Sequence, residues 1–197
     1  MIIYSIIPAA GKSKRMKINK YLLTLQNKSL IRNTIDNLLD AELNDIYLIL
    51  GENSSIQSEV KDYKIHILVN NLKISEMADS IKIALNNINA SNEDGILITP
   101  ADIPLVKIDT IKHIVKSFIE NKDKIIIPIY KGRKGHPVIF PSKIIYDLFN
   151  ENTLRDILKK HEYAIFYCKV NDEGILLDID SIEDYERVKH LLSNKTT

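Results

Sequence analysis

Residues 1–11 read MIIYSIIPAAG, an apolar run of strand length that leads directly into a turn of small residues. Isoleucine and tyrosine favour strands, and apolarity that is continuous rather than alternating indicates burial on both faces. Strands of this kind lie in sheets that helices cover on both sides, and ligands bind beyond their carboxyl ends. The opening of the chain therefore favours an α/β fold and directs the search for a site to the residues that follow the strands.

Similar apolar runs recur along the chain and alternate with segments of helical periodicity. The further predicted strands are Asp45–Leu50, Ile65–Val69, Gly95–Thr99, Lys124–Ile129 and Ala164–Cys168. The predicted helices are Ser29–Ala41, Ser54–Lys61, Ser75–Asn89, Ile108–Asn121, Ser142–Phe149, Thr153–His161 and Ser181–Leu192. This alternation predicts an α/β fold, a Rossmann-like doubly wound three-layer sandwich with a mostly parallel sheet. Tyr130–Pro141 contains two glycines and two prolines and is predicted to be an excursion from the sheet.

The composition narrows the class of partner. The chain has 197 residues, 45% of them hydrophobic, and we expect residues 1–197 to form one domain. The 27 basic and 26 acidic side chains nearly cancel, which argues against nucleic-acid or membrane partners and favours a small-molecule substrate. Cys168 is the only cysteine, which excludes internal disulfides and thiolate metal clusters. Because the first residues contain no basic leader or cleavage site, we expect a cytoplasmic protein.

The turn after the first strand is a candidate triphosphate site. The small residues of Pro8-Ala9-Ala10-Gly11 let backbone N–H groups approach a phosphate, while Arg15 and Lys20 supply positive charge. The segment is neither a Walker A loop nor a dinucleotide fingerprint, because it contains a single glycine. Taken alone, it is also compatible with an ordinary surface loop.

Two acids are candidate metal ligands. Asp102 follows an apolar strand, and such an acid suits Mg²⁺, which accepts one or two carboxylates and completes its octahedron with water and phosphate oxygens. The alternative is that Asp102 caps the helix that begins near Lys107. Asp180 belongs to a late acidic segment in which Ser181 and Asp184 form a helix start like a capping box.

A loop late in the chain is a second candidate for anion binding. Residues 132–140 read GRKGHPVIF, so two glycines stand beside Arg133, Lys134 and His136. Such a loop presents cations and backbone amides to a phosphate, and the histidine can donate a hydrogen bond or hold the loop. The alternative is a basic hairpin turn with a solvated histidine.

Together these motifs resemble the MobA-like nucleotidyltransferase superfamily, and the resemblance runs from Ile2 to about Leu192. The superfamily's opening turn, lysine and metal motif match at Ala9-Ala10-Gly11, Arg15-Met16, Lys20 and Asp102-Ile103-Pro104-Leu105. The GRKGHP stretch and the spacing of Asn70, Met77 and Ser80 resemble its molybdenum cofactor cytidylyltransferase branch. On helical spacing alone, Met77 is instead a core residue. The implied fold is that of the nucleotide-diphospho-sugar transferases.

The resemblance also implies an activity and a set of roles. CMP is transferred from CTP to the terminal phosphate of molybdenum-bound molybdopterin, with a client molybdoenzyme as a further partner of the product. Mg²⁺ or Mn²⁺ is held by Asp102 and Asp180, and Lys20, Arg15 and Asp102 are the catalytic residues. The implied nucleotide contacts are Pro8, Ala9, Ala10, Gly11, Lys12, Asn70, Met77 and Ser80, and the implied acceptor contacts are Arg133, Gly135, His136 and Arg155. CTP is favoured because the GTP-using branch carries Leu-Ala-Gly-Gly where this chain has Pro-Ala-Ala-Gly.

Two other functions remain open on the sequence. One is a cytidylyl- or uridylyltransferase that acts on a sugar or polyol phosphate, although those families place proline directly before the motif lysine and this chain has Asn19 there. The other is a non-catalytic module that binds nucleotide or pterin as a chaperone for a molybdoenzyme. Release of pyrophosphate separates an enzyme from such a module.

Overall fold

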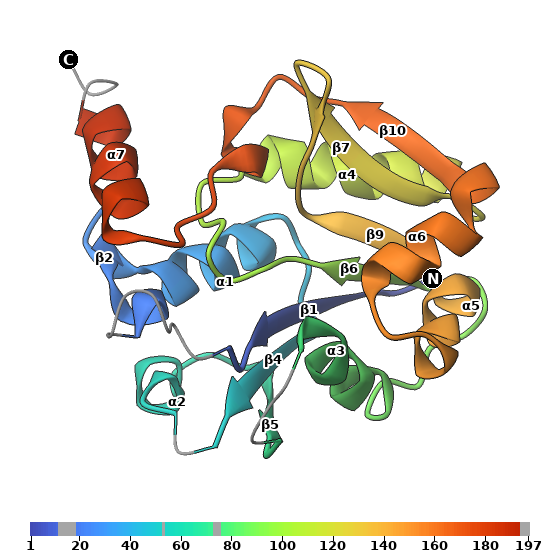
Figure 1. Ribbon diagram of the computed structural model, residues 1–197, viewed down its shortest axis with the longest axis horizontal. Helices are drawn as coiled ribbons and strands as arrows, with labels where there is room; N and C mark the ends of the chain where they lie inside the picture. The colour runs from blue at the N-terminus through green and yellow to red at the C-terminus, as the bar shows by residue number, and fades with distance from the viewer. Residues whose placement is uncertain (12–18, 53, 73–75, 194–197) are drawn as a thin grey trace.

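The computed structural model describes residues 1–11, 19–52, 54–72 and 76–193. Within these residues, eight strands form one mixed sheet in the order β10-β7-β9-β6-β1-β4-β5, with β8 paired to β7 (Figure 1). The strands are β1 (Ile3–Ala9), β4 (Ile46–Gly51), β5 (His66–Asn70), β6 (Gly95–Ile98), β7 (Ile125–Tyr130), β8 (Arg133–Lys134), β9 (Val138–Pro141) and β10 (Ile165–Lys169). The pairs β1–β4, β1–β6, β4–β5 and β7–β10 are parallel. The pairs of β9 with β6 and β7, and of β7 with β8, are antiparallel.

Helices cover both faces of the sheet and give a three-layer sandwich (Figure 1). On one face, α1 (Leu30–Asp40), α2 (Ile56–Glu59) and α4 (Ile108–Glu120) bury their apolar side chains in one core cluster. On the other face, α3 (Met77–Leu85), α5 (Ser142–Ile145) and α6 (Leu154–Lys160) build a second cluster. Burial of apolar surface against both faces is the main stabilising term for such a sheet. The predicted fold class is therefore confirmed.

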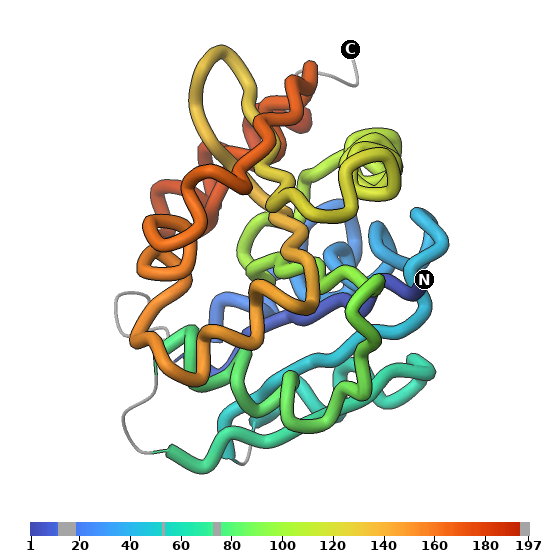
Figure 2. The backbone as a smooth tube through the Cα atoms, turned by 90° about the vertical axis from the view of Figure 1, so that its right-hand side faces the viewer, coloured from blue at the N-terminus to red at the C-terminus, as the bar shows by residue number. Residues whose placement is uncertain are grey.

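A third, smaller cluster holds the end of the chain. The hairpin of β2 (Thr24–Leu25) and β3 (Lys28–Ser29) packs with α7 (Ile182–Ser193). Leu25, Leu30, Ile179 and Val188 are fully buried there. Figure 2 shows the segment before α7 beside the projecting loop between β7 and β9, whereas Figure 1 shows α7 itself at the left end of the molecule. Short 3₁₀ turns complete the chain: η1 (Lys20–Leu22), η2 (Tyr146–Asn150), η3 (Glu162–Ala164) and η4 (Glu173–Leu176).

The predicted strands and helices are all present, but the prediction for Tyr130–Pro141 was wrong in part. Tyr130–Pro141 was expected to leave the sheet, whereas its last four residues form β9, which lies between β6 and β7 in the middle of the sheet. The register sets Val138 beside Ile98 and Ile139 beside Ile126, and all residues of β9 are buried. The true excursion is limited to the hairpin around β8. Because proline is unusual inside a sheet and two prolines lie so close together here, the sequence did not indicate this strand of only four residues.

The expectation of burial on both faces fails for the two outermost strands. Val69 in β5 is 46% exposed, and Phe166 and Tyr167 in β10 are 39% and 43% exposed. Each of these strands has a neighbour on one side only among the described residues, so helices cover it incompletely. No helix in the described ranges has both the length and the apolarity that crossing a membrane requires.

Candidate active site

The carboxyl ends of four neighbouring parallel strands, β6, β1, β4 and β5, meet at one edge of the sheet. β1 lies between β6 and β4, and the end of β4 pairs with the end of β5 through Gly51 and Asn70. The Ala10 carbonyl oxygen lies so close to Gly51 that an added Cβ would stand 3.4 Å from it. Pro8 and Ala9, predicted as turn residues, are the last residues of β1 and are buried. Of the predicted opening motif, Lys12 and Arg15 lie outside the described residues.

The structure brings Lys20 together with both predicted metal ligands. The Lys20 ammonium donates hydrogen bonds to Asp102 at 2.5 Å and to Asp180 at 2.7 Å. Lys20 is 8% exposed, and the Asp102 and Asp180 side chains are 18% and 44% exposed. Three segments far apart in the chain therefore converge on one point, where a cation already bridges two carboxylates.

Backbone hydrogen bonds fix this convergence. The Ile179 amide donates to the Asp102 carbonyl at 3.0 Å, so the segment that carries Asp180 is tied to the segment that carries Asp102. From α1, the Asn37 side-chain amide donates to the carbonyls of Pro104 and Val106 at 2.9 and 3.2 Å. The loop that follows Asp102 is thus held from two sides, which keeps the two acids within reach of one ion.

The charges in the site support one another. Burial lowers the pKa of Lys20, but attraction to Asp102 and the hydrogen bonds to both carboxylates outweigh it, so the pKa is raised above its ordinary value. Burial, with the negative charge of Asp102, raises the pKa of the neighbouring Tyr21 to about 12. The lysine is therefore a cation and the tyrosine a neutral phenol at physiological pH.

Two of the acids were considered as helix caps, and only one of them caps a helix. Asp102 does not cap α4, because Lys107 occupies the N-cap position without a side-chain bond and its amide donates to Asp172 at 2.9 Å. Ser181 and Asp184 do form the predicted cap: the Ser181 hydroxyl and amide donate to Asp184 at 2.8 and 3.0 Å. The Ser181 hydrogen bond is the main reason why the pKa of Asp184 is lowered.

The predicted nucleotide residues after β5 lie together. Asn70 and Ser80 are buried, and the Asn70 side-chain amide donates to the Ser80 hydroxyl at 3.2 Å. The Asn70 side-chain oxygen accepts from the Leu72 amide at 3.0 Å, which shapes the start of the loop. Met77, the first residue of α3, is 45% exposed, so the alternative that it is a core residue is wrong.

The loop between β8 and β9 approaches the acids through His136. Burial lowers the pKa of His136, and Asp102, the Ile98 backbone and Asp178 only partly offset this effect. The ring nitrogen Nδ1 is buried and has no hydrogen-bond partner in the described part of the chain. The alternative of a solvated histidine is therefore wrong, and the residue is a neutral imidazole next to Asp102.

The remaining predicted acceptor residues are less closely placed. Gly135 packs against η4, where an added Cβ would stand 2.4 Å from the Ile175 carbonyl oxygen. Arg133 is exposed on the hairpin. Arg155 is exposed in the first turn of α6, and its side chain makes no hydrogen bond or ion pair with another described residue.

Asp172 is a residue near the site that was not predicted from the sequence. This acid is 3% exposed and accepts hydrogen bonds from the Lys107 and Gly174 amides, each at 2.9 Å. Asp172 thereby joins η4 to the start of α4 and holds the end of the loop that follows Asp102. The signal available in the sequence was the Asp-Glu-Gly run that begins three residues after the end of the last strand, a pattern typical of a turn with its own side-chain cap.

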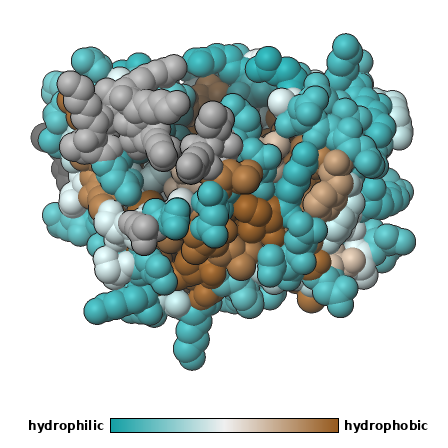
Figure 3. All heavy atoms as spheres, turned by 60° about the horizontal axis from the view of Figure 1, so that its bottom comes forward, coloured by the Kyte–Doolittle hydropathy of each residue, from teal (hydrophilic) through white to brown (hydrophobic). Residues whose placement is uncertain are grey.

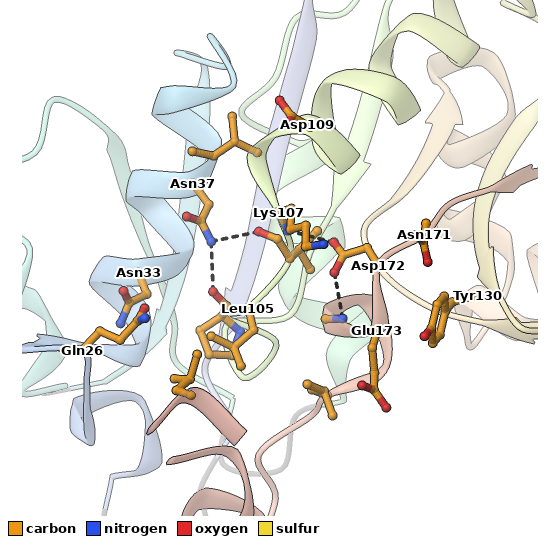
Figure 4. A pocket seen from close by; sticks show the side chains of 16 residues that line it. Gln26, Asn33, Asn37, Leu105, Lys107, Asp109, Tyr130, Asn171, Asp172 and Glu173 are labelled. Atoms are coloured by element: carbon orange, nitrogen blue, oxygen red, sulfur yellow. Dashed lines mark hydrogen bonds between the residues drawn. The ribbon is translucent and has the colours of Figure 1, made fainter. Parts of the chain in front are cut away.

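A hollow of about 690 Å³ is lined by Lys107 and Asp172 but not by Asp102 or Asp180 (Figure 4). Figure 4 shows Asn37, Lys107 and Asp172 converging on its wall. None of the predicted site residues lines it. Lys20, Asp102 and Asp180, the predicted residues for a triphosphate and a metal, converge outside this hollow.

The donor set fits a hard divalent cation. Among the described residues there is no group of three or more histidine, cysteine or acidic side chains placed to hold a metal. Two carboxylates do converge on one ammonium nitrogen, so the space between them already suits a positive charge. One or two carboxylates are what Mg²⁺ takes from a protein when phosphates and water supply its other ligands.

Comparison with known families decides the type of site. The model of the family described as MobA-like NTP transferase domain matches residues 5–165. The chain belongs to this family. As a MobA-like protein it is a nucleotidyltransferase, and the convergence of β1, Lys20 and the two acids lies where the sheet geometry places a nucleotide.

Curated relatives of this MobA-like chain have names that refer to different functions. A probable molybdenum cofactor guanylyltransferase of Natranaerobius thermophilus is 23% identical over 201 residues, which cover 95% of each chain. The bifunctional protein GlmU of Clostridioides difficile is 31% identical over 120 residues, 60% of this chain but 26% of GlmU. A 2-C-methyl-D-erythritol 4-phosphate cytidylyltransferase of Pseudoalteromonas translucida is 35% identical over 122 residues, 59% of this chain and 49% of the relative. The chain thus spans only a quarter to a half of the length of two of these three relatives.

Solved structures share the fold. Rv0371c of Mycobacterium tuberculosis is 22% identical and superposes with a TM-score of 0.82 over 96% of this chain and 97% of Rv0371c. A complex of Rv0371c with manganese gives a TM-score of 0.78, with 21% identity over 96% of this chain and 99% of the other. At these identities the likeness concerns the fold alone, and it confirms the nucleotide-diphospho-sugar transferase type predicted from the sequence.

Proposed function

We propose that the protein is a divalent-metal-dependent cytidylyltransferase that transfers CMP from CTP to the terminal phosphate of molybdenum-bound molybdopterin. The observation that carries the proposal is the bridge from Lys20 to Asp102 and Asp180, at 2.5 and 2.7 Å, at the carboxyl end of the sheet. Two carboxylates and a lysine at one point match the charges of a metal–triphosphate complex. The full-length relative whose name refers to the molybdenum cofactor supports this choice of acceptor.

The residues of the chain act by positioning and by neutralising charge. The acceptor phosphate attacks the α-phosphorus of CTP in line, the bond to the β-phosphate oxygen breaks, and pyrophosphate leaves. Because the attacking phosphate is already anionic, no general base is needed. Asp102 and Asp180 would hold the metal ion, and the Lys20 ammonium would then pair with the leaving pyrophosphate. When bound, Mg²⁺ or Mn²⁺ supplies Lewis-acid neutralisation of the phosphate oxygens.

The other proposed roles follow from position. Gly11 follows the end of β1, where backbone amides can face the phosphates, and Asn70, Met77 and Ser80 adjoin the nucleoside at the end of β5. Lys12 and Arg15 retain their proposed contacts with the triphosphate. His136 is proposed to donate a hydrogen bond to the acceptor rather than to supply a charge, because its burial keeps it neutral. Gly135, Arg133 and Arg155 are proposed to lie farther along the acceptor.

The first test is pyrophosphate release by the purified protein with Mg²⁺ and each of CTP, GTP, ATP and UTP, with and without molybdenum-bound molybdopterin. We expect release with CTP and the pterin together. Asp102→Asn is expected to lower turnover by a factor of about 10² to 10³, which is typical for the loss of one preorganised charge contact in a transferase site. The matched control is Asp109→Asn, an exposed acid in the first turn of α4. Near-normal turnover of Asp102→Asn would remove the proposed metal site.

A second candidate is cytidylyl transfer to a polyol phosphate. Its support is the 35% identity to a 2-C-methyl-D-erythritol 4-phosphate cytidylyltransferase over 122 residues. The same assay with CTP and that polyol phosphate in place of the pterin distinguishes the two candidates. Release with GTP and the pterin would instead indicate guanylyl transfer. CTP binding without release in any combination would favour a binding module that delivers the cofactor to a client molybdoenzyme.

A further inference from the structure

The outer edge of β5 is open. β5 is the last strand of the sheet, and it pairs only with β4 among the residues that the structure describes. Alternate backbone N–H and C=O groups of such a strand point away from its neighbour and are ready to pair with another strand. An unpaired edge is satisfied either by water or by the strand of another chain.

The two edge strands of this sheet, β10 and β5, differ in whether charged side chains protect them from pairing with another strand. β10 ends in the exposed Lys169, and the Lys134 ammonium lies 4.9 Å from the ring centre of Tyr167. Lysine on an edge strand discourages pairing, because a partner strand would have to bury the charge. β5 reads His66-Ile67-Leu68-Val69-Asn70, without lysine, acid or proline. Only β5 is therefore suited to add a strand.

Apolar side chains surround this edge. Val69 is 46% exposed, and past the end of the strand Leu72 and Met77 are 54% and 45% exposed. Ile67 and Leu68 are half-buried, on opposite faces of the sheet. Figure 3 shows hydrophobic side chains gathered on the face of the molecule that carries β5 and α3. A contiguous apolar surface beside an open edge marks an interaction site.

We infer that β5 is the contact by which two copies of this chain form a dimer. The two β5 strands pair antiparallel about a two-fold axis at Leu68, and the two sheets become one continuous sheet. The axis is normal to the sheet, so the two α3 helices lie on the same face of the dimer. Such an interface is isologous and closes after two copies.

The sequence of β5 is complementary to itself in this register. Leu68 faces the Leu68 of the second copy, Ile67 faces Val69, and His66 faces Asn70. Apolar and β-branched pairs across strands are stabilising, and here no like charges oppose each other. Pairing of β5 with β10 of another copy would instead bury Lys169 and would propagate into an open filament.

The flanking side chains supply the area that the strand lacks. A stable interface buries about 800 Å² on each partner, which is more than a five-residue strand provides. Leu72 extends the apolar strip beyond the strand, and Lys64 lies opposite Leu72, where its aliphatic stem can cover the leucine. The dimer depends on no assumption about the substrate.

The first experiment measures mass in solution by light scattering and sedimentation. We expect a dimer for the full chain and a dissociation constant raised at least about tenfold by Val69→Lys, because the lysine would be buried at the centre of the contact. The matched control Leu191→Lys changes a leucine of similar exposure on α7 and should leave the dimer intact. A monomeric native chain, or a dimer equally weakened by both variants, would overturn the proposal.

The second experiment tests the register and does not depend on weakening the interface. Leu68→Cys should form a disulfide between two copies under mild oxidation, because side chains directly opposite in an antiparallel pair have Cβ atoms about 4.5–5.5 Å apart. Tyr167→Cys, on the other edge, should not form one. The native Cys168 is 2% exposed and does not compete. Cross-linking through Tyr167→Cys, or none through Leu68→Cys in a chain that is dimeric, would reject β5 as the contact.

Discussion

At the scale of single residues, Lys20 is the centre of the proposed site. It is the counter-ion of Asp102 and Asp180 when no metal is bound, so a metal must replace it there. We expect Lys20→Met to lower the free energy of unfolding by about 2 kcal/mol without metal, because two partly buried carboxylates lose their partner. We also expect Mg²⁺ to raise the Tm of Lys20→Met more than that of the native chain, since the ion would relieve the repulsion. Thermal unfolding with and without Mg²⁺ measures both effects.

The control for Lys20→Met is Lys28→Met. Lys28 pairs with Asp36, but its side chain is 54% exposed, and exposed ion pairs contribute about 0–1 kcal/mol. Lys28→Met should therefore change neither the Tm nor the response to Mg²⁺ appreciably. An equal response of native chain and Lys20→Met to Mg²⁺ would mean that the ion does not bind between these acids.

Gly135 has a packing role that is separate from any contact with an acceptor. An alanine there would place its Cβ 2.4 Å from the Ile175 carbonyl oxygen, so the loop must move away from η4. We expect Gly135→Ala to lower the free energy of unfolding by about 1–3 kcal/mol, as overpacking usually does. Gly11→Ala serves as the stability control, because among the described residues its Cβ would meet nothing closer than the Tyr21 hydroxyl at 3.7 Å. Urea unfolding of both variants decides; equal stabilities would contradict the packing role.

The individual residues of the site were predictable only in part. Asp102 stands out in the sequence because it follows an apolar run and matches a family motif, and Asp180 because it belongs to a late acidic segment; the structure does bring the two acids together. The bridge by Lys20 was not predicted, because the motif assigns lysine to the triphosphate and says nothing of the state without a ligand. Asp172 was missed because its bonds go to backbone amides, one of them 65 residues away. Such long-range bonds leave no periodic pattern in a sequence.

At the scale of elements, Asp94 joins the start of β1 to the turn before β6. Its carboxylate accepts hydrogen bonds from the Ile2 amide at 2.6 Å and the Ser91 amide at 2.7 Å. Burial alone would raise the pKa of Asp94, but these hydrogen bonds outweigh burial and lower it. The folded state thus favours the ionised carboxylate more than the unfolded state does. Asp94 therefore stabilises the fold above its unfolded pKa of about 3.9, and this contribution is lost as the pH falls through the lower folded value.

The corresponding prediction concerns Asp94→Asn. We expect it to lower the free energy of unfolding by about 1–3 kcal/mol at neutral pH. The Asn side chain is uncharged and has a single acceptor oxygen, so it cannot accept both hydrogen bonds as the ionised carboxylate does. The difference from the native chain should shrink as the pH falls below about 4. Urea denaturation at a series of pH values measures this difference. A gap that stays constant down to the acid limit would show that the charge of Asp94 is not what matters.

The elements themselves were largely predictable, and the failures have physical causes. β1, β4 and β6 lie in the middle of the sheet, so their continuous apolar runs mark them clearly. β9 also lies in the middle but is too short and too close to prolines to show such a run. β5 and β10 have similar apolar runs although they are edge strands, since the order of strands in a sheet depends on long-range pairing. Local sequence determines which segments are strands and does not determine which strands are neighbours.

At the scale of the whole molecule, the site depends on how the end of the chain docks. α7 begins directly after Asp180, and its buried Val188 packs against Leu25 and Leu30, which follow Lys20 closely in the sequence. The Tyr185 hydroxyl also donates a hydrogen bond to the Thr24 carbonyl at 2.5 Å. The segments that carry the lysine and the second acid are therefore held together by a cluster that contains neither of them.

This arrangement predicts that a cavity in the α7 cluster weakens ligand binding. We expect Val188→Ala to lower the free energy of unfolding by about 1–3 kcal/mol and, in addition, to reduce the rise in Tm that Mg²⁺ and CTP produce. Ile157→Ala, a fully buried change in α6 on the other face of the sheet, should cost about 2–5 kcal/mol and leave that rise unchanged. Thermal unfolding of the three proteins over a range of CTP concentrations separates the two effects. If Val188→Ala responds to CTP as fully as Ile157→Ala does, the position of Asp180 is set by its own loop, through the Ile179 amide and the Asp102 carbonyl, and not by the docking of α7.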